Sequence, residues 1–438
     1  MKHVSFLVAL ATPFFLQAQK NAVPTDSVRI LMPLEIVGVR ATDKQPFTKT
    51  NITKTQIELL NTGQDIPFVL NQTPGVVAHS DAGNGIGYTG LRIRGTDATR
   101  INVTLNGIPY NDAESQGSFL VNIPDVLSST NSIQIQRGVG TSTNGAGAFG
   151  ASLNISTHET ADKPYAEFNN SFGSFNSWKN TIKLGSGLID GKFSVDARLS
   201  RITSDGFMER ATSNLQAFYF SAAYYAKKTT FRYTTFSGRN RTYQAWNGVP
   251  EALLATNRRF NGLGLQSNGE YYPNQTDNYQ QHHHQFFITH TINNKWSINL
   301  ANYLTLGKGY YEEYRMNNRY SAYNLPNPSA TVTRTDLTRQ LWLDNQFFGQ
   351  NITVHYKHKA NEITFGGGWN QYKGLHYGYV LWAANGGVPV NHRWYNLDAL
   401  KADRNMYAKW LHSVQPNLQL FVDLQVRNVQ YQMNGFRN

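Results

Sequence analysis

Cysteine is absent from this sequence, and charged residues are scarce. Among 438 residues there is no Cys, and Asp, Glu, Lys and Arg together make up 16%. The lack of thiols excludes disulfides, thiolate metal sites and thiol catalysis. Acidic residues are the scarcer sign, 28 against 40 Lys and Arg, which gives a formal net charge of +12. Either a polar lumen and loops facing anionic lipid headgroups, or attraction of an anionic ligand, explains this excess.

Long hydrophobic runs are missing after the N-terminus. Residues 1–19 combine a basic start with an apolar run from Val4 to Leu16 and small residues near Ala18. This pattern predicts a removable secretory signal, because a spanning helix needs about 20 apolar residues. No later run is long enough to span as a helix. A membrane-embedded chain would therefore have to be a β-barrel, since lipid offers no partner to unpaired backbone groups.

Aromatic residues and glycine are plentiful, by contrast. Aromatics reach 13%, with 24 Tyr and 24 Phe, and there are 36 Gly. Low charge combined with many Tyr, Asn and Gly is unusual for a soluble enzyme. It is ordinary for an outer-membrane barrel with aromatic girdles.

Short alternating runs dominate residues 91–157. Period-2 runs at 101–105, 132–136 and 151–156 are bordered by Gly, Asn, Asp or Pro, and each predicts a short strand. Asn106-Gly107 predicts a tight turn after the first of them. These features indicate a small β-rich domain.

Two short helices are expected upstream of these strands. Thr53 or Thr55 could cap the first, which runs to about Leu60. Asp65 opens the second, with Pro67 in its first turn, where proline is tolerated.

From Tyr165 onward the pattern changes to long amphipathic strands. Apolar and polar residues alternate at 192–203, with a slip near the end, and again at 296–300 and 418–427. Charges on every other residue fit strands with an apolar outer face and a polar inner face. Short turns are expected at 190–191, 227–228, 293–294, 360–361 and 416–417, and longer polar stretches lie at 205–214, 241–280, 308–337 and 379–402. This alternation is typical of periplasmic turns and extracellular loops.

An ordered set of motifs resembles the plug domain of TonB-dependent outer-membrane receptors. The motifs read IPFVLNQTPGV, LRIRG, VTLNGIPYND, SIQIQRG and GAGAFGASLNIST. The resemblance covers essentially the whole chain. It implies a signal peptide at 1–19, a leader with a coupling segment at 20–50, a plug domain at 51–160 and the N-terminal part of a transmembrane β-barrel at 161–438. The expected fold is an all-β membrane barrel with an N-terminal α+β plug.

The strand count predicts a partial barrel. We count about 11 strands, whereas large plugged transporters have about 22. The chain ends at 435–438 without the terminal amphipathic strand that this family usually shows. An open half-barrel would leave two unpaired edges in lipid. We therefore expect the sequence to be a fragment, a split or truncated reading frame, or a piece that needs a missing half.

The resemblance implies energised import across the outer membrane. A scarce ligand would bind from outside, and TonB, with its inner-membrane energising complex, would pull on Leu34-Glu35-Ile36-Val37-Gly38-Val39, which resembles the family's coupling segment. From the residues alone, this apolar island could add as a strand to another sheet or be a chance cluster in a disordered leader. The expected partners are TonB, a small-molecule metal chelate and outer-membrane lipid, without nucleic acid.

A ferric siderophore or other iron complex is the expected cargo. Haem, cobalamin and oligosaccharide are the alternatives within the family. A passive adhesive barrel and a non-functional gene fragment are the alternatives outside it.

Candidate contact residues form two sets. Arg94 and Arg137 would be partly desolvated inside a barrel and would need carboxylate partners, with Glu167 as a candidate; the alternative is a pair of solvated surface arginines. The ligand-binding candidates are aromatic or charged residues in expected outward turns and loops, namely Tyr88, Tyr110, Trp246, Tyr310, Tyr311, Arg315 and Trp382. Any single ring among them could instead belong to an interfacial aromatic belt.

The sequence contains short matches to cofactor and metal motifs, but the residues around them do not support such sites. Residues 145–150 match the G-x-G-x-x-G spacing, but 151–156 alternates as a strand, so the helix N-terminus that holds a pyrophosphate is missing. The run 282–284 is three histidines, whose side chains alternate in direction on a strand. No nucleophile elbow or paired carboxylates are found. We expect no cofactor, no metal site and no catalytic residue.

Overall fold

The computed structural model describes residues 40–143, 145 and 147–437 of this chain. These residues belong to one compact unit. The predicted signal peptide at 1–19 and the expected coupling segment Leu34–Val39 lie outside the described residues. None of the helices in the described part is long and apolar enough to cross a membrane.

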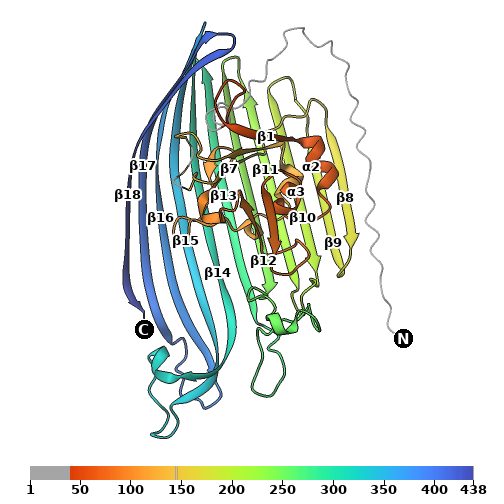
Figure 1. Cartoon of the computed structure of the whole chain (residues 1–438), viewed down its shortest axis with the longest axis vertical. Coiled ribbons are helices and arrows are strands. Elements are labelled where there is room, and N and C mark those ends of the chain that lie inside the picture. Colours follow the sequence, from red (N-terminus) through yellow and green to blue (C-terminus); the bar gives the residue numbers. More distant parts are fainter. Residues whose placement is uncertain (1–39, 144, 146, 438) are drawn as a thin grey trace, which may run out of the picture. The chain divides into compact units, whose positions relative to one another are not determined.

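The N-terminal part builds a small mixed sheet (Figure 1). Its five strands follow the order β1-β6-β7-β4-β5, so β1 is an edge strand. Only β4 and β7 pair in parallel. The strands of this sheet are β1 (Thr48–Thr53), β4 (Ile101–Leu105), β5 (Ile108–Pro109), β6 (Ser132–Arg137) and β7 (Ala151–Ser156), and a separate hairpin joins β2 (Val76–Ser80) to β3 (Thr89–Ile93).

The local signals for this domain are confirmed. The three alternating runs are β4, β6 and β7. Helix α2 (Lys54–Leu60) begins at Thr53, whose side chain accepts from the Gln56 N–H in a capping box. Helix α3 (Ile66–Leu70) begins after Asp65 with proline in its first turn. Asn106 and Gly107 both take positive φ, 58° and 80°, as the tight turn between β4 and β5 requires.

Aliphatic side chains hold this domain together and attach it to the second sheet. Ile57, Leu70, Ile133 and Leu153 are fully buried, and each such side chain contributes about 1.5–3 kcal/mol to folding. The same core cluster includes Tyr219 and Phe236 from the long strands that follow. The plug therefore packs directly on one face of the second sheet, which we call the inner face.

The second sheet has 11 antiparallel strands, as expected, and neighbours in the chain are neighbours in the sheet. They are β8 (Tyr165–Gly173), β9 (Ser177–Gly185), β10 (Phe193–Ser204), β11 (Ser213–Tyr225), β12 (Thr229–Tyr243), β13 (Thr276–Thr291), β14 (Trp296–Arg319), β15 (Arg334–His358), β16 (Asn361–Ala383), β17 (Arg393–Gln415) and β18 (Leu418–Arg437). Figure 1 shows them as one continuous succession from β8 to β18.

From β10 onward the connections alternate in length as expected, although the long ones are shorter than expected. The first hairpin does not follow this pattern, because β8 and β9 are joined by 174–176 alone. All five short turns are found between strands, for example at 359–360 and 416–417. The long connections cover 205–212, 244–275, 320–333 and 384–392. They are shorter because strands such as β14 and β15, with 24 and 25 residues, continue as hydrogen-bonded ladders into the polar stretches that the sequence predicted as loops.

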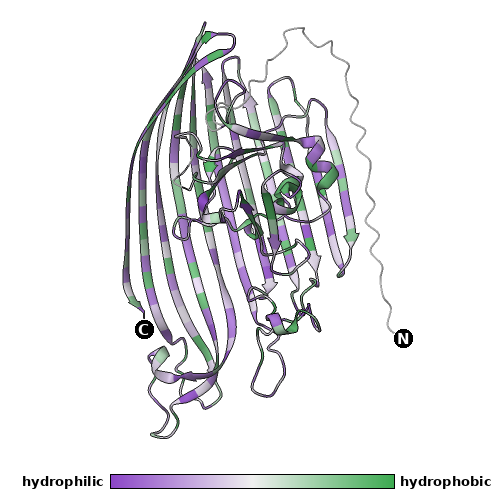
Figure 2. Cartoon of the chain, in the orientation of Figure 1, coloured by the Kyte–Doolittle hydropathy of each residue, from purple (hydrophilic) through white to green (hydrophobic). Residues whose placement is uncertain are grey.

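Hydrophilic and hydrophobic residues alternate along the long strands (Figure 2), so the two faces of this sheet differ in chemistry. On β10, Phe193 and Leu199 are exposed on the outer face, whereas Arg198 and Ser200 are buried on the inner face. The apparent slip at Ile202 is not a break in alternation. Ile202 faces inward and is 2% exposed because it packs against Ile86 and Val121 of the plug.

Candidate functional site

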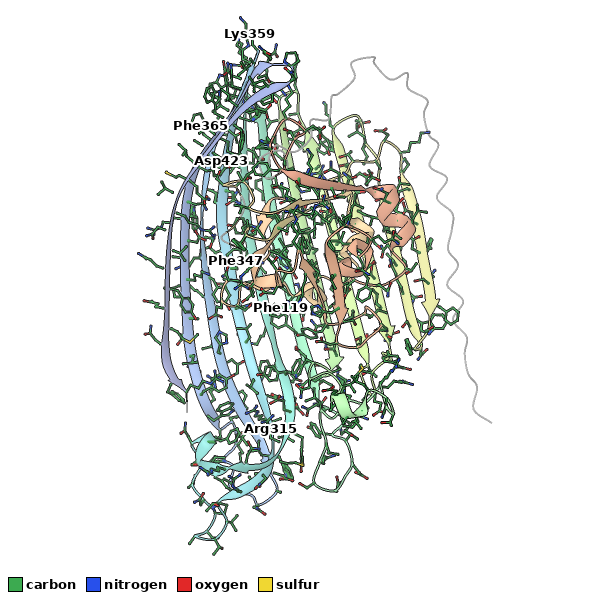
Figure 3. The ribbon with its side chains drawn as sticks, viewed as in Figure 1. Phe119, Arg315, Phe347, Lys359, Phe365 and Asp423 are labelled. Atoms are coloured by element: carbon green, nitrogen blue, oxygen red, sulfur yellow. The ribbon has the colours of Figure 1, made fainter. Side chains whose placement is uncertain are left out.

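The plug and the inner face of the sheet border a cavity of about 690 Å³. This volume lies in the range of small-molecule sites. Its walls are mainly aromatic. Plug loops contribute Tyr88, Tyr110 and Phe119, and the sheet and its connections contribute Trp246, Tyr279, Tyr311 and Tyr395. Phe119 is labelled in Figure 3.

The polar groups of this cavity are few and mostly already engaged. The Tyr88 hydroxyl donates to the Asp277 carboxylate, and the Tyr110 hydroxyl donates to the Phe119 carbonyl at 2.6 Å. Burial, and then the negative charge of Asp277, raises the pKa of Tyr88 well above its ordinary value. Burial likewise raises the pKa of Tyr110. Both phenols therefore stay neutral, and their rings are fixed in place.

Five of the seven ligand-binding candidates border the cavity, namely Tyr88, Tyr110, Trp246, Tyr310 and Tyr311. The Trp246 ring links the plug part of the cavity wall to the sheet part. Its centroid lies 6.2 Å from that of Tyr88 in the plug and 5.8 Å from that of Tyr311 on β14.

Tyr310 differs from its neighbour in orientation. Neighbouring residues of a strand point to opposite faces, and the Tyr310 ring packs 4.5 Å from Trp342. It shares a pairing row with Arg241 and Asn278. Tyr311 thus presents its ring to the cavity, and Tyr310 presents its ring to the outer face.

The other two candidates lie away from the cavity. Arg315 and Trp382 are not among its lining residues, and the Trp382 ring packs against Tyr314 at 6.4 Å. Figure 3 shows Arg315 farther along β14, toward the long connections, than Phe119. Strands β14 and β16 continue past the plug loops, which puts their ends beyond the cavity.

Sequence reasoning missed several lining residues, including Tyr279, Tyr395 and Phe119. Tyr279 fell inside the polar stretch 241–280, which was expected to be a loop but contains the start of β13. The available signal was alternation: Asp277, Tyr279 and Gln281 lie on one side of β13, and all three border the cavity.

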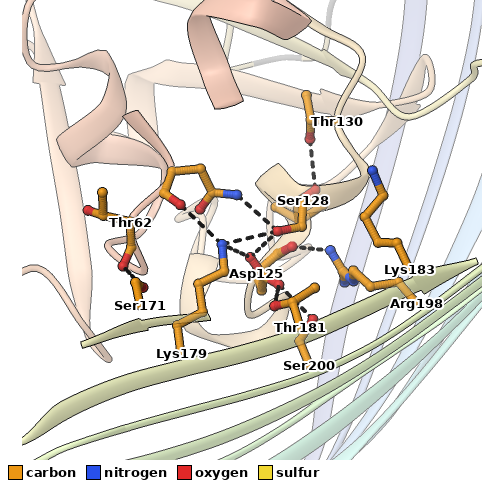
Figure 4. A network of polar contacts seen from close by, with 12 residues as sticks. Thr62, Asp125, Ser128, Thr130, Ser171, Lys179, Thr181, Lys183, Arg198 and Ser200 are labelled. Carbon is orange, nitrogen blue, oxygen red and sulfur yellow. Dashed lines mark hydrogen bonds and ion pairs between the residues drawn. The ribbon is translucent and has the colours of Figure 1, made fainter. Parts of the chain in front are cut away.

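A buried ionic network ties the plug to the sheet (Figure 4). The Asp125 carboxylate lies 2.9 Å from Lys179 Nζ on β9, and both side chains are almost completely buried. Thr181 and Ser200 donate hydroxyl hydrogen bonds to the same carboxylate at 2.7 and 2.6 Å. Arg198 donates to the Asp125 backbone carbonyl.

This network keeps Asp125 ionised. Burial alone would raise the pKa of the carboxyl, but the charges of Arg198 and Lys179 and the hydrogen bonds from Ser200 and Ser128 lower it to about 2. Asp125 also adopts a left-handed backbone, with φ of 51°. The strain of such a conformation is tolerated where surrounding contacts over-determine it.

The expected arginine contacts take another form. Arg137 donates to the Pro74 carbonyl within the plug at 3.1 Å, and Arg94 is exposed. Glu167 pairs with Lys183 on the neighbouring strand at 3.2 Å. Within the described residues, none of the ion pairs joins either arginine to Glu167. The signal that sequence reasoning missed was the set of cations at 179, 183 and 198 on the polar face of two adjacent strands, which calls for an acid from the plug.

A second carboxylate anchors the plug loop at 110–119. Glu114 accepts hydrogen bonds from Tyr372 and His376 on β16, both at 2.7 Å, and from Tyr431 on β18 at 2.8 Å. Burial opposes ionisation, but the hydrogen bonds from His376 and Tyr372 bring the pKa of Glu114 below its ordinary value. The loop that carries Tyr110 and Phe119 to the cavity is thus tied to the far strands of the sheet.

The histidine run does not gather into a metal-type cluster. His283 faces inward, where its ring stacks on Phe236 at 4.3 Å. His284 faces the other way and contacts the Tyr233 hydroxyl at 2.8 Å. In the part of the chain that the structure describes, no group of three His, Cys, Asp or Glu side chains is placed to hold a metal ion.

Comparison with known proteins identifies the first domain. The sequence model of the family described as TonB-dependent Receptor Plug Domain matches residues 41–152. No curated protein sequence matches the chain.

Solved structures share the fold. The open form of the ferric-catecholate import receptor Fiu from E. coli K12 is 15% identical, with a TM-score of 0.66 over 89% of this chain and 61% of that chain. The ferric citrate transporter FecA in its unliganded form is 14% identical, with a TM-score of 0.67 over 90% of this chain and 57% of that chain. BauA, the ferric preacinetobactin receptor from Acinetobacter baumannii, is 13% identical, with a TM-score of 0.63 over 90% and 59%. The chain thus spans about three fifths of the length of these proteins.

Proposed function

We propose that this chain, which carries the plug domain and has the fold of TonB-dependent receptors, takes part in importing a ferric siderophore across the outer membrane. The matched family consists of transport receptors rather than enzymes. The three similar structures are named for iron complexes, which favours an iron chelate over haem, cobalamin or oligosaccharide as the cargo.

The observation that carries this proposal is the aromatic cavity shared by plug and sheet. Its volume of about 690 Å³ suits a small chelate. Because the plug supplies Tyr88, Tyr110 and Phe119, a bound ligand would touch the element that has to move for transport. A ligand there would also lie on the side of the plug where the long connections, which we assign to the cell exterior, adjoin the sheet.

The first described residues of the plug supply a path for force. The expected TonB-binding segment, Leu34–Val39, directly precedes Arg40. The Arg40 guanidinium donates to the backbone carbonyls of Ser132 and Asn154, both at 3.0 Å. Ala41 exchanges two hydrogen bonds with the Gln134 side chain, at 2.8 and 3.1 Å. A pull on the leader would therefore be felt first at β6.

The strand order of the plug sheet determines which strand would separate under such a pull. Strand β1 is at the edge of the plug sheet and pairs only with β6, from Thr48 opposite Arg137 to Thr53 opposite Ser132. An edge strand can be peeled away without breaking the rest of the sheet. The buried contacts of Asp125 hold another part of the plug on β9 and β10. We infer that TonB removes β1 and the leader side of the plug while the Asp125 network resists.

Growth on iron tests the proposal. A strain without its own copy of this gene is given the gene intact, or the gene without the codons for Leu34–Val39, with a ferric siderophore as its only iron. We expect growth with the intact gene alone. Binding of the labelled siderophore to whole cells is measured in parallel, and it should be equal for both forms.

The outcomes separate the parts of the proposal. Growth that does not depend on the gene rules out the ferric siderophore as cargo, and the same assay with haem, cobalamin or oligosaccharide then finds the alternative. Growth that needs the gene but not Leu34–Val39 rules out coupling through that segment. Binding without growth for both forms would favour a passive surface barrel.

A further inference from the structure

A groove of about 720 Å³ runs over the outer face of the sheet, on the side opposite the plug. It crosses β8 to β13 and shares none of its lining residues with the cavity. Thr181 and Ser200 also border it, although their side chains contact Asp125 on the inner face. Its lining has two parts, one polar and one apolar. The polar part contains Arg201 and Arg239 with Asn170, Asn180 and Gln216, and the apolar part contains Phe168, Ile182, Leu199 and Phe218.

Strand register aligns these two parts as adjacent rows. Gln216 pairs with Arg201 on one side and with Arg239 on the other. Because neighbouring strands lie about 4.8 Å apart, the two arginines start about 10 Å from each other on the same face. The row continues through Asn180 to Asn170.

The apolar row lies two residues farther from the long connections. Leu199 pairs with Ile182 and Phe218, and Ile182 pairs with Phe168. These side chains are 69% (Phe168), 42% (Ile182), 60% (Leu199) and 38% (Phe218) exposed. On a soluble protein such a stripe would be unusual, but it is the surface that a lipid-facing strand presents. The arginines therefore lie at the boundary between the apolar stripe and the polar ends of the strands.

The two guanidinium groups are available to a ligand. Within the described residues, none of the ion pairs or side-chain hydrogen bonds involves Arg201 or Arg239. Lys308 lies farther along the same row and differs from them, because Asp344 neutralises it at 2.7 Å. No carboxylate lines the groove, so the arginines give it a local positive charge.

We propose that this groove binds a phosphate-bearing lipid of the leaflet next to the long connections. Its phosphate groups would lie between Arg201 and Arg239, with Asn180 and Gln216 as further donors. Its acyl chains would lie along Leu199, Phe218, Ile182 and Phe168. Guanidinium groups suit this ligand because their planar donors match phosphate oxygens in pairs. The site is on the membrane side of the sheet and is independent of the imported cargo.

Native mass spectrometry of the full chain in non-ionic detergent tests this site. The protein is titrated with phosphatidylglycerol and, separately, with phosphatidylcholine carrying the same acyl chains. We expect phosphatidylglycerol to remain bound at lower concentrations. The double variant R201Q/R239Q should weaken its binding roughly 10- to 30-fold, since each cation near an anionic headgroup contributes about 1 kcal/mol.

Two controls make the result decisive. The variant R258Q/R334Q removes the same charge from exposed positions outside the groove, and it should bind phosphatidylglycerol like the unchanged protein. Glycerol phosphate, which has the charge but no acyl chains, should fail to compete at the same concentration. Equal binding of the two lipids, equal loss in the control variant, or competition by glycerol phosphate would each overturn the proposal.

Discussion

Asp125 shows how one side chain decides the position of the plug. Among the described residues, it is the only carboxylate of the plug that interacts with both Lys179 and Arg198. The two cations belong to adjacent strands of the sheet. A buried charge is tolerated only when it is paired and hydrogen-bonded, so each of the three groups depends on the other two.

Asp125→Asn keeps the shape of the side chain and removes its charge. Lys179 and Arg198 are then left buried without a counter-charge, and removing one member of such a set costs about 3–5 kcal/mol. We expect faster proteolysis of the plug and faster amide exchange at 126–130 in detergent. Asp43→Asn is the matched control, because the Asp43 carboxylate, which pairs with Lys49, is fully exposed. Equal protease resistance of the two variants would contradict a structural role for Asp125.

Asp65 and Asp125 make the stability of the plug depend on pH in opposite directions. Burial raises the pKa of this carboxyl to about 7, against an ordinary value of 3.8. The folded plug therefore binds a proton that the unfolded chain releases, and the stability of the plug falls as pH rises from about 4 to about 7. For Asp125 the folded pKa lies below the ordinary value, so its contribution is lost only as pH falls from about 4 toward 2.

Asp65→Asn should remove the first of these dependences. Amide exchange of the plug strands at pH 5 and pH 8, corrected for the intrinsic effect of pH, measures the difference in opening free energy. We expect the unchanged plug to be more stable at pH 5 by about 2–4 kcal/mol, and the variant to show no such difference. A plug that is equally stable at both pH values before substitution would show that Asp65 is ionised in the fold.

At the scale of elements, β1 is the part of the plug that we expect to separate first, because it is the edge strand of the plug sheet. Asn51 and Gln134 face each other across β1 and β6, and the Gln134 amide donates to the Asn51 side chain at 2.7 Å. Because the chain has no cysteine, Asn51→Cys with Gln134→Cys introduces the only two thiols. We expect their disulfide to block import and to leave ligand binding intact.

The same variant supplies its own control. Reduction should raise uptake of the labelled siderophore to the level of the single variant Gln134→Cys, and Asn51→Cys alone should behave like the unchanged protein under oxidising conditions. Full uptake by the oxidised double variant would show that β1 stays paired with β6 during transport.

The loop at 110–119 is the second element with a testable role. Glu114→Gln removes the charge that receives hydrogen bonds from His376 and two tyrosines. A hydrogen bond to a charged group contributes about 1.5–3 kcal/mol, so amide exchange at 112–117 should rise at least tenfold. Strand β4 should be unaffected. Glu270→Gln, in the exposed connection at 244–275, should leave the loop unchanged, and equal exchange in both variants would contradict the anchor.

The sequence predicted elements well wherever the cause of a structure is local. Thr53, Asp65 and Asn106-Gly107 act through caps and a turn that lie within a few residues, so the helices and strands of the plug could be recognised. The ends of β14 and β15 could not, because a strand segment that carries mostly polar residues looks like a loop in the sequence. Their ladders depend on pairing with the adjacent strand, which the sequence does not display.

At the scale of the whole molecule, the sequence indicated the rings that line the cavity but not the ion pair that joins the plug to the sheet. Tyr88, Tyr110, Trp246 and Tyr311 could be chosen from the type of residue and the type of connection, and the structure brings them to one cavity. The pairing of Asp125 with Lys179 could not be chosen in this way. It joins positions 54 residues apart in the chain, and only the packing of the plug on β9 and β10 brings them together.

Substitutions on the outer face of the sheet can test whether this face contacts lipid. On β18, alternate residues from Leu418 to Val426 are apolar and 44–77% exposed, and this nine-residue stretch has the length of a tilted spanning strand. Leu424→Arg places a charge in this band, at a cost of about 2–4 kcal/mol near the bilayer centre. Gln425→Arg is the matched control, since neighbouring residues face opposite sides. We expect only Leu424→Arg to reduce the fraction of protein that binds phosphatidylcholine vesicles, measured by co-flotation. If both variants bind vesicles equally well, this face of β18 does not contact lipid, and the groove at Arg201 and Arg239 loses the membrane setting on which its proposed ligand depends.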